Sequence, residues 1–212
     1  MEYRTIAAPC EGSITEKRSE FIAQLQPVLT VEEAAAFVEQ TKAKHHKARH
    51  NVWAYCLRAD GAVRYSDDGE PQGTGGVPVL SVLQKSQLTD VCCVVTRYFG
   101  GVLLGASGLT RAYSAAAALA VQNAKIQCFC EAVRLQITMD YALYGKVSYL
   151  LPEYGILEVS SDFGELVTLC IDIKKETHPL LEARLVEISC GTIQTQVLME
   201  HYADFASVSD GL

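Results

Sequence analysis

The sequence has little of what marks a membrane or exported protein. Its longest run of small apolar residues, around Ala112–Val121, has about half of the roughly 20 residues that a membrane-spanning helix needs. The start, Met-Glu-Tyr-Arg-Thr-Ile, has no basic flank followed by an apolar core. We therefore expect no signal peptide, no membrane partner and a cytoplasmic location.

The eight cysteines form no Cys-x-x-Cys pair, which excludes the usual zinc and dithiol redox motifs. They occur singly, as Cys92-Cys93, or as Cys128-x-Cys130. Cys56, Cys92 and Cys93 lie in apolar strand patterns, so we expect buried, reduced thiols.

The signatures of nucleotide enzymes are missing as well. The chain contains neither the G-x-x-x-x-G-K-[ST] loop of P-loop proteins nor the G-x-G-x-x-G turn of dinucleotide-binding folds. No Ser–His–Asp or Cys–His arrangement has a local signature. A binding surface is therefore a better hypothesis than a phosphoryl-transfer site.

What is present is an ordinary globular composition, with 49% hydrophobic and 20% charged residues among 212. This length allows one large domain or two small ones. The net charge of −7 is unevenly spread: residues 1–126 hold 13 basic and 12 acidic side chains, and residues 127–212 hold 5 and 13. Any contact with nucleic acid should therefore come from the N-terminal half.

Two glycine-rich loops, 66–78 and 96–113, contain eight of the fifteen glycines, and each runs into an expected helix. Backbone N–H groups at such a junction form an anion site together with the helix dipole. The alternative is that the glycines only permit tight turns beside packed strands. If the loops bind an anion, the candidate residues are His50, Thr74, Arg97, Tyr98, Gly105, Ser107, Gly108 and Arg111.

Three carboxylates, Asp67, Asp68 and Glu70, cluster in the first loop without the spacing of a calcium loop. They are candidates for Mg²⁺ ligands, for acid/base groups, or for partners of Arg97 and Arg111. The alternative is an Asx-type turn in which the carboxylates accept loop amides. No cofactor is required by the sequence, and Mg²⁺ is the one candidate.

A basic segment precedes these loops. Lys42, Lys44, Lys47 and Arg49 are interspersed with three histidines over nine residues. This pattern is typical of a helix C-terminus, where the dipole favours cations, and it also fits an edge that contacts RNA. A metal site is less favoured because the H-E-x-x-H spacing is absent.

Hydrophobic periodicity predicts the elements of the first domain. We expect a strand or hairpin over 12–29, a helix from a Thr30 cap to about 45, a hairpin over 51–65 that turns at Asp60-Gly61, and a helix over 77–85. A central strand buried on both faces follows over 89–98, and then an alanine-rich helix over 109–123.

The second half of the chain reads as a compact βαββαβ unit, the order of the ferredoxin-like motif. Its strands are expected over 133–139, 156–160, 166–173 and 193–199, with helices over 141–153 and 177–189. The predicted domains are 1–128 and 129–205, followed by a frayed tail over 206–212.

Four blocks of the sequence resemble the YigZ/IMPACT family. They are "SDDGEPQGTGGVPVLSVL", "VVTRYFGGVLLGASGLTRAYS", Arg18-Ser19-Glu20-Phe21, and Ala48–Tyr55, which resembles the family's A-x-H-N-x-x-A-Y. The match extends over essentially the whole chain. It departs from the family pattern at Ser107, where glycine is usual, and at Gly75, where alanine is usual. Both are small residues, and Ser107 is a candidate helix cap.

The resemblance implies an α+β fold with two parts. The N-terminal domain would be of the ribosomal-protein/GHMP-kinase-like type, and the C-terminal domain would be ferredoxin-like, similar to the last domain of elongation factor G. Eukaryotic relatives regulate translation, through an additional domain that this sequence lacks, so the resemblance implies only an association with translation.

Two functional hypotheses follow. In the first, a translation-associated regulatory protein binds RNA, the ribosome or a translation factor through the glycine-loop face, with Tyr98 and Tyr113 exposed for stacking. In the second, an enzyme acts on a phosphorylated or carboxylated small molecule as a metal-assisted hydrolase or transferase. Asp67, Asp68 and Glu70 would then serve as metal or acid/base groups, and His50 would carry a proton.

Overall fold

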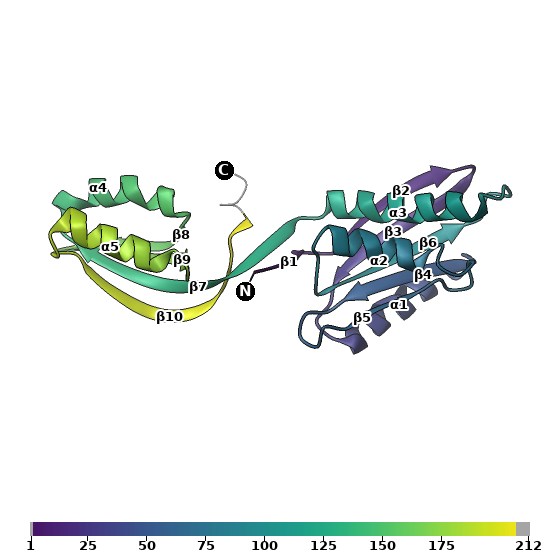
Figure 1. Ribbon diagram of the computed structural model, residues 1–212, viewed down its shortest axis with the longest axis horizontal. Coiled ribbons are helices and arrows are strands. Elements are labelled where there is room, and N and C mark those ends of the chain that lie inside the picture. Colours follow the sequence, from purple (N-terminus) through teal and green to yellow (C-terminus); the bar gives the residue numbers. More distant parts are fainter. Residues whose placement is uncertain (1, 207–212) are drawn as a thin grey trace. The chain divides into compact units, whose positions relative to one another are not determined.

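The computed structural model describes residues 2–206 and contains two compact units (Figure 1). The N-terminal unit is Tyr3–Gln127, and the C-terminal unit contains Glu2 and the described chain from Cys128 onward. The division lies one residue from the predicted domain end at 128. Both units are α+β, as predicted. Except for Ala206, the predicted tail 206–212 lies outside the described residues.

The N-terminal unit is built on a sheet of five antiparallel strands. Their order is β2 (Cys10–Glu16), β3 (Ser19–Pro27), β6 (Val91–Tyr98), β4 (His50–Cys56) and β5 (Val63–Ser66). The predicted hairpin β4–β5 is therefore confirmed, and the segment expected to be a strand or a hairpin forms the hairpin β2–β3. A short strand that was not predicted, β1 (Tyr3–Ile6), forms a bridge between Arg4 and Leu88.

Helices cover both faces of this sheet. Figure 1 shows α2 (Gly76–Lys85) and α3 (Gly105–Asn123) on one face and α1 (Val31–Lys44) on the other. Strand alternation sends Val52, Ala54 and Cys56 into the core under α2 and α3, and Tyr55 into the core under α1. The strand β6 is buried on both faces, as its continuous apolar run predicted.

The start of α1 shows how local chemistry sets an element boundary. The backbone N–H of Glu33 donates to Thr30 Oγ1 at 3.2 Å, which confirms Thr30 as the N-cap. The carboxylate of Glu33 accepts from Leu29 N at 2.6 Å rather than from the cap residue itself. This is a variant of the capping box in which the glutamate bonds the residue before the cap instead of the cap residue.

The helix α3 begins at Gly105, four residues before the predicted start at 109. Gly105 has φ +72°, so glycine supplies the left-handed residue at which the loop enters the helix. Gly108 then lies buried in the first turn, where an added Cβ would come within 3.0 Å of Leu104. Ser107 is therefore inside the helix rather than at its cap, and the expectation that it caps the helix is wrong.

The C-terminal unit has the predicted βαββαβ order. Its elements are β7 (Ile126–Met139), α4 (Tyr141–Leu150), β8 (Leu157–Phe163), β9 (Val167–Lys174), α5 (His178–Ser189) and β10 (Gln194–Asp204), with a short 3₁₀ turn (Leu151–Tyr154) after α4. The strands lie in the order β10-β7-β9-β8, and neighbours are antiparallel. Both helices pack on one face of the sheet over a core that includes Leu135, Ile171 and Leu181. The chain passes between the units twice, between Glu2 and Tyr3 and between Gln127 and Cys128 inside β7.

Candidate functional site

Several loops and helix ends meet at one end of the N-terminal sheet. The antiparallel registers Glu20–Tyr98, His50–Arg97 and Trp53–Ser66 bring the β2–β3 turn, the start of β4 and the ends of β5 and β6 to this end. The first turns of α2 and α3 follow directly. We call residues 17–18, 44–50, 66–76 and 98–111 the loop end. Figure 1 shows these segments together.

The carboxylate of Asp67 organises the first glycine loop. It accepts the backbone N–H groups of Gly73, Gly75 and Gly76 at 2.8–2.9 Å, so the amides predicted to bind an anion already hold one from the chain itself. Burial raises the pKa of Asp67, but these three amide bonds outweigh it and leave the pKa below its ordinary value of 3.8. Thr74 belongs to the same turn, because its hydroxyl donates to Pro71 O at 2.7 Å. The turn alternative therefore describes this loop better than an anion site.

Glu70 and Arg97 form a buried ion pair beneath the loop. Arg97 Nη1 lies 2.6 Å from Glu70 Oε1, and their side chains are only 7% and 3% exposed. The hydroxyl of Tyr113 donates to the same Glu70 oxygen at 2.8 Å. Tyr113 is fully buried, so the expectation that it is exposed for stacking is wrong. Glu70 and Arg97 hold each other and are not presented to an external ligand.

Asp68 connects β4 to the loop and to α1. Its side chain accepts from Asn51 N at 2.7 Å and lies 3.4 Å from Lys42 Nζ, in a partly exposed pair. Its backbone carbonyl contacts His50 Nδ1 at 2.9 Å. Because a carbonyl only accepts, Nδ1 carries the proton, and Nε2 of a neutral His50 is left as an acceptor. Lys42 is thus engaged with its own chain.

Tyr98 lies at the end of β6 and is half-buried. Its hydroxyl is 2.9 Å from His45 Nδ1, and His45 Nε2 is 3.2 Å from Gln24 Oε1. Burial lowers the pKa of His45, and the charge of Lys44 lowers it further, although the charges of Glu11 and Glu20 partly oppose this by raising it. The net shift keeps this histidine neutral near pH 7, so it adds no charge to the basic segment.

The second loop, between β6 and α3, is arranged differently from the first. Leu103 is 82% exposed at its tip, and Phe99 and Val102 are also exposed. The guanidinium groups of Arg49 and Arg97 lie 5.9 and 5.5 Å from the Phe99 ring centroid, within cation–π range. No carboxylate of the described chain is recorded at this loop's amides. The first two turns of α3 present Gly105, Ser107 and Arg111 on their exposed side.

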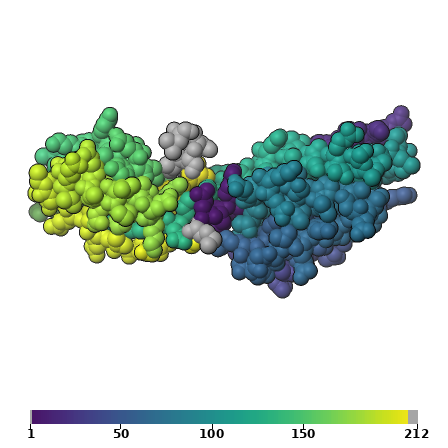
Figure 2. Space-filling view, viewed as in Figure 1, coloured from purple at the N-terminus to yellow at the C-terminus, as the bar shows by residue number. Residues whose placement is uncertain are grey.

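The turn between β2 and β3 consists of Lys17 and Arg18 alone, since Glu16 pairs with Ser19. Both turn residues have positive φ, 44° and 66°, a conformation that favours asparagine and glycine in two-residue hairpin loops. Gly100 packs against this turn so closely that an added Cβ would lie 2.0 Å from the Arg18 carbonyl carbon. In Figure 2 the purple tip of this hairpin projects beside the teal surface of the α3 region. Sequence reasoning did not single this turn out, although a pair of cations between two alternating strands was visible.

Most cations of the loop end have no internal partner. Among residues 2–206, no hydrogen bond or ion pair is recorded for the charged groups of Lys17, Arg18, Lys44, Lys47, Arg49 and Arg111. In the first glycine loop, Asp67 holds amides and Glu70 holds Arg97. The exposed Glu16 and Glu20 flank the hairpin turn without an ion-pair partner among residues 2–206, but the six cations outnumber them. The charge that the loop end presents to solvent is therefore predominantly positive.

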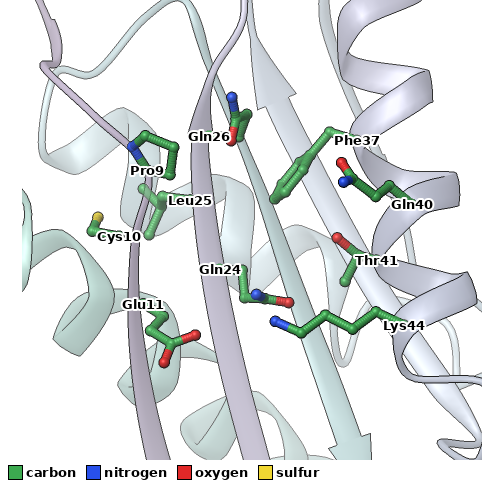
Figure 3. Close-up of a pocket in the computed structure, with 10 residues that line it drawn as sticks. All are labelled: Pro9, Cys10, Glu11, Gln24, Leu25, Gln26, Phe37, Gln40, Thr41 and Lys44. Carbon is green, nitrogen blue, oxygen red and sulfur yellow. The ribbon is translucent and has the colours of Figure 1, made fainter.

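The N-terminal unit also has a groove of about 560 Å³, which borders the loop end at Lys44. It separates α1 from β2 and β3, and Figure 3 shows Lys44 extending from α1 toward Gln24 and Glu11. Gln26, Gln40 and Phe37 also line it. Most of the lining is uncharged and includes three glutamines, and its one cation lies opposite its one carboxylate. It lacks the charge of a polyanion site, so the loop end remains the candidate site.

The arrangement bears on two further expectations. The carboxylates of Asp67, Asp68 and Glu70 are bonded to different partners, so they do not form a set of oxygens that fits Mg²⁺.

No helix between residues 2 and 206 is long and apolar enough to cross a membrane. Binding of a ligand by His50, Tyr98, Gly108 and the other predicted residues stays a prediction.

Comparison with known proteins connects this geometry to a family. The Impact N-terminal domain model matches residues 17–121, and a domain of unknown function, DUF1949, matches residues 137–192. An IMPACT family member of Haemophilus influenzae is 36% identical over 86% of this chain and 90% of its own length. The member YigZ of Escherichia coli is 32% identical over 92% and 97%.

A solved structure agrees with these matches. A crystal structure of a hypothetical protein covers 94% of this chain and 98% of its own, with 32% identity and a TM-score of 0.59. The family model alone covers nearly half of the chain, and the relatives cover almost all of it. The chain therefore belongs to the IMPACT family.

Proposed function

We propose that the protein is a translation-associated regulator that binds RNA through the loop end of its N-terminal unit. The main observation behind the proposal is the β2–β3 turn. Its two residues, Lys17 and Arg18, are both cationic, and both have the strained positive φ at the tip of the hairpin. The family resemblance associates these proteins with translation, which makes RNA of the translation machinery the first partner to test.

The strain in this turn supports a role other than stability. A residue with a Cβ in the left-handed region costs about 1–2 kcal/mol, whereas Asn-Gly adopts the same turn readily. Lys17 and Arg18 adopt this conformation in a two-residue loop that Asn-Gly would form without the cost in conformational energy. Strained residues of this kind cluster at functional sites.

The charge of the loop end suits a phosphate backbone. Lys44, Lys47, Arg49 and Arg111 join the hairpin cations without internal carboxylate partners, so each can pair with a phosphate oxygen. The acidic C-terminal half of the chain does not provide such a surface.

Phe99 adds a surface for bases. Its ring is 41% exposed and has the guanidinium of Arg49 at 5.9 Å from its centroid. An aromatic ring beside unpaired cations is the combination that single-stranded RNA binders use, with base stacking on the ring and phosphates on the cations. This combination favours single-stranded over double-stranded RNA.

The test separates binding from stability at the same turn. The double substitution Lys17→Asn with Arg18→Gly removes two cations but supplies the residues that this turn prefers. We expect the variant to melt at a higher temperature and to bind single-stranded RNA more weakly. The slope of log K against log salt should fall by about 0.7 for each phosphate that the variant no longer neutralises.

The control removes two cations of the same unit away from the loop end. Lys85 lies at the C-terminal end of α2, and Arg64 lies on the edge strand β5. The variant Lys85→Asn with Arg64→Gln should bind RNA as the unmodified protein does. Equal RNA affinity in the turn variant and the unmodified protein would contradict the proposal, as would binding of ribosomal proteins or translation factors without RNA.

The enzyme hypothesis has one observation in its favour. His50 has its proton held on Nδ1 by the Asp68 carbonyl, which leaves Nε2 as a candidate base. A thermal-shift screen of nucleotides and divalent cations, with His50→Gln as the comparison, tests it. A ligand that stabilises the protein but not the His50→Gln variant would favour an enzyme, and no shift with any ligand would count against one.

A further inference from the structure

A cluster of thiols and a carboxylate lies in the C-terminal unit. Cys128 Sγ is 3.0 Å from Glu2 Oε1, and Cys130 Sγ is 3.6 Å from Glu2 Oε2. The two sulfurs and the nearest carboxylate oxygen all lie within 4.8 Å of one another. This is the one group of three His, Cys, Asp or Glu side chains among residues 2–206 whose ligand atoms converge in this way.

Strand geometry explains why the two thiols face the same way. Residues i and i+2 of an extended strand project to one face, so the Cys-x-Cys sequence on β7 presents two sulfurs side by side. Pairing with β10 fixes the strand at this point, because Phe205 N donates to Cys128 O at 2.8 Å and Asp204 Oδ1 accepts from Cys128 N at 2.9 Å. The thiol pair is therefore held by two strands rather than by a loop.

We propose that Cys128, Cys130 and Glu2 bind a thiophilic d¹⁰ metal ion, with Zn²⁺ as the ion to test. With Zn–S distances of about 2.3 Å and Zn–O distances of about 2.1 Å, a tetrahedral centre places its sulfur and oxygen ligands roughly 3.5 Å apart. The two observed sulfur–oxygen distances, 3.0 and 3.6 Å, lie on either side of this value. Small side-chain adjustments would therefore complete a three-ligand site.

The surroundings of the three ligands suit a metal site that keeps one coordination position open to the groove beside it. On one side, the thiols pack in a small apolar cluster with Ala132 and Phe205. On the other, Glu2 and Cys130 border a groove of about 320 Å³. Two further carboxylates, Glu131 and Glu176, and two cations, Lys174 and Lys175, also line it. The fourth position of the metal would face this groove, where water or one of those carboxylates can complete the coordination.

Binding must displace protons. Burial raises the pKa of both thiols, and the Glu2 carboxylate helps to raise the pKa of Cys128 to about 12, so both sulfurs hold protons when no metal is bound. The metal ligand is the thiolate. Each Zn²⁺ that binds therefore forms two Zn–S bonds and releases the two thiol protons to solvent.

The test uses the full chain, reduced, chelator-treated and without a polyhistidine tag. Titration with Co²⁺ should give one equivalent of binding with a sulfur-to-cobalt charge-transfer band, and Zn²⁺ should abolish the band. Cys128→Ser and Cys130→Ser should each halve the band and weaken binding by at least about tenfold, the loss that even an outer-shell substitution commonly causes. Glu2→Gln should weaken binding and leave the band.

Cys190→Ser provides the matched control, because Cys190 is exposed in the same unit and lies outside the cluster. Circular dichroism of the serine variants checks that they fold. Absence of a charge-transfer band in the reduced protein would overturn the proposal. So would a band that survives in both cluster variants, or a reduced pair that binds no metal and only forms a disulfide in air.

Discussion

The two glycine loops at the loop end look alike in sequence and differ in structure. The loop before α2 is closed on itself, because Asp67 holds its amides and Glu70 holds Arg97 and Tyr113. The loop before α3 exposes Leu103 at its tip, and no carboxylate of the described chain is recorded at its amides. In the first loop the amides at the helix entrance bond a carboxylate of the chain itself, whereas anion binding by the second loop stays a prediction. Substitutions in the first loop should affect stability, and those in the second should affect binding.

The largest effect is expected for Glu70→Gln, because it leaves the Arg97 charge buried without its partner. Removing one member of a buried ion pair costs about 3–5 kcal/mol. Urea unfolding should show a loss of this size in the free energy of unfolding. The double variant Glu70→Gln with Arg97→Met removes the stranded charge and should recover most of it. A loss below about 1 kcal/mol in the single variant would mean that the pair is solvated.

A smaller effect is expected for Asp67→Asn, which replaces charge-assisted bonds to three amides with neutral ones. Hydrogen bonds to charged groups contribute about 1.5–3 kcal/mol, and asparagine retains part of them, so we expect a loss of about 2 kcal/mol at pH 7. The pKa of Asp67 is lowered in the folded state, so its contribution is present above its unfolded pKa near 3.8 and is lost as the pH falls through the lower folded value.

The measurement is urea unfolding of both proteins between pH 7 and pH 2.5. The difference between the unmodified protein and the variant should shrink as the pH falls below about 4, where Asp67 gains its proton first in the unfolded chain and, at lower pH, in the folded one. A difference that stays constant with pH would contradict the assignment of the effect to the ionised carboxylate.

The smallest effect is expected at the tip of the second loop. Leu103→Ala should change the free energy of unfolding by no more than about 0.5 kcal/mol, because the side chain is 82% exposed. The neighbouring Leu104 is only 9% exposed and packs in the core, so Leu104→Ala should cost about 2–4 kcal/mol. Equal costs at the two positions would show that the second loop is as closed as the first.

Elements with a clear hydrophobic period were predictable from the sequence. The alternation of β4, the continuous apolar run of β6, the Thr30 cap and the βαββαβ order all follow from local spacing, and the structure confirms them. The start of α3 was misplaced because Gly105 and Gly108 read as a loop, whereas packing against Leu104 favours a helix there. The four residues of β1 were too short to give a periodic signal.

The sequence by itself determined where the site should lie, because glycines, cations and carboxylates gather in the segments that end strands and begin helices. It did not determine which of those charges are free. That depends on the sheet register that buries Arg97 against Glu70, on the fold of the loop around Asp67, and on the turn that exposes Lys17 and Arg18. Charge pairing between residues 27 positions apart is set by three-dimensional packing, so only the tertiary structure decided which loop stays open to a partner.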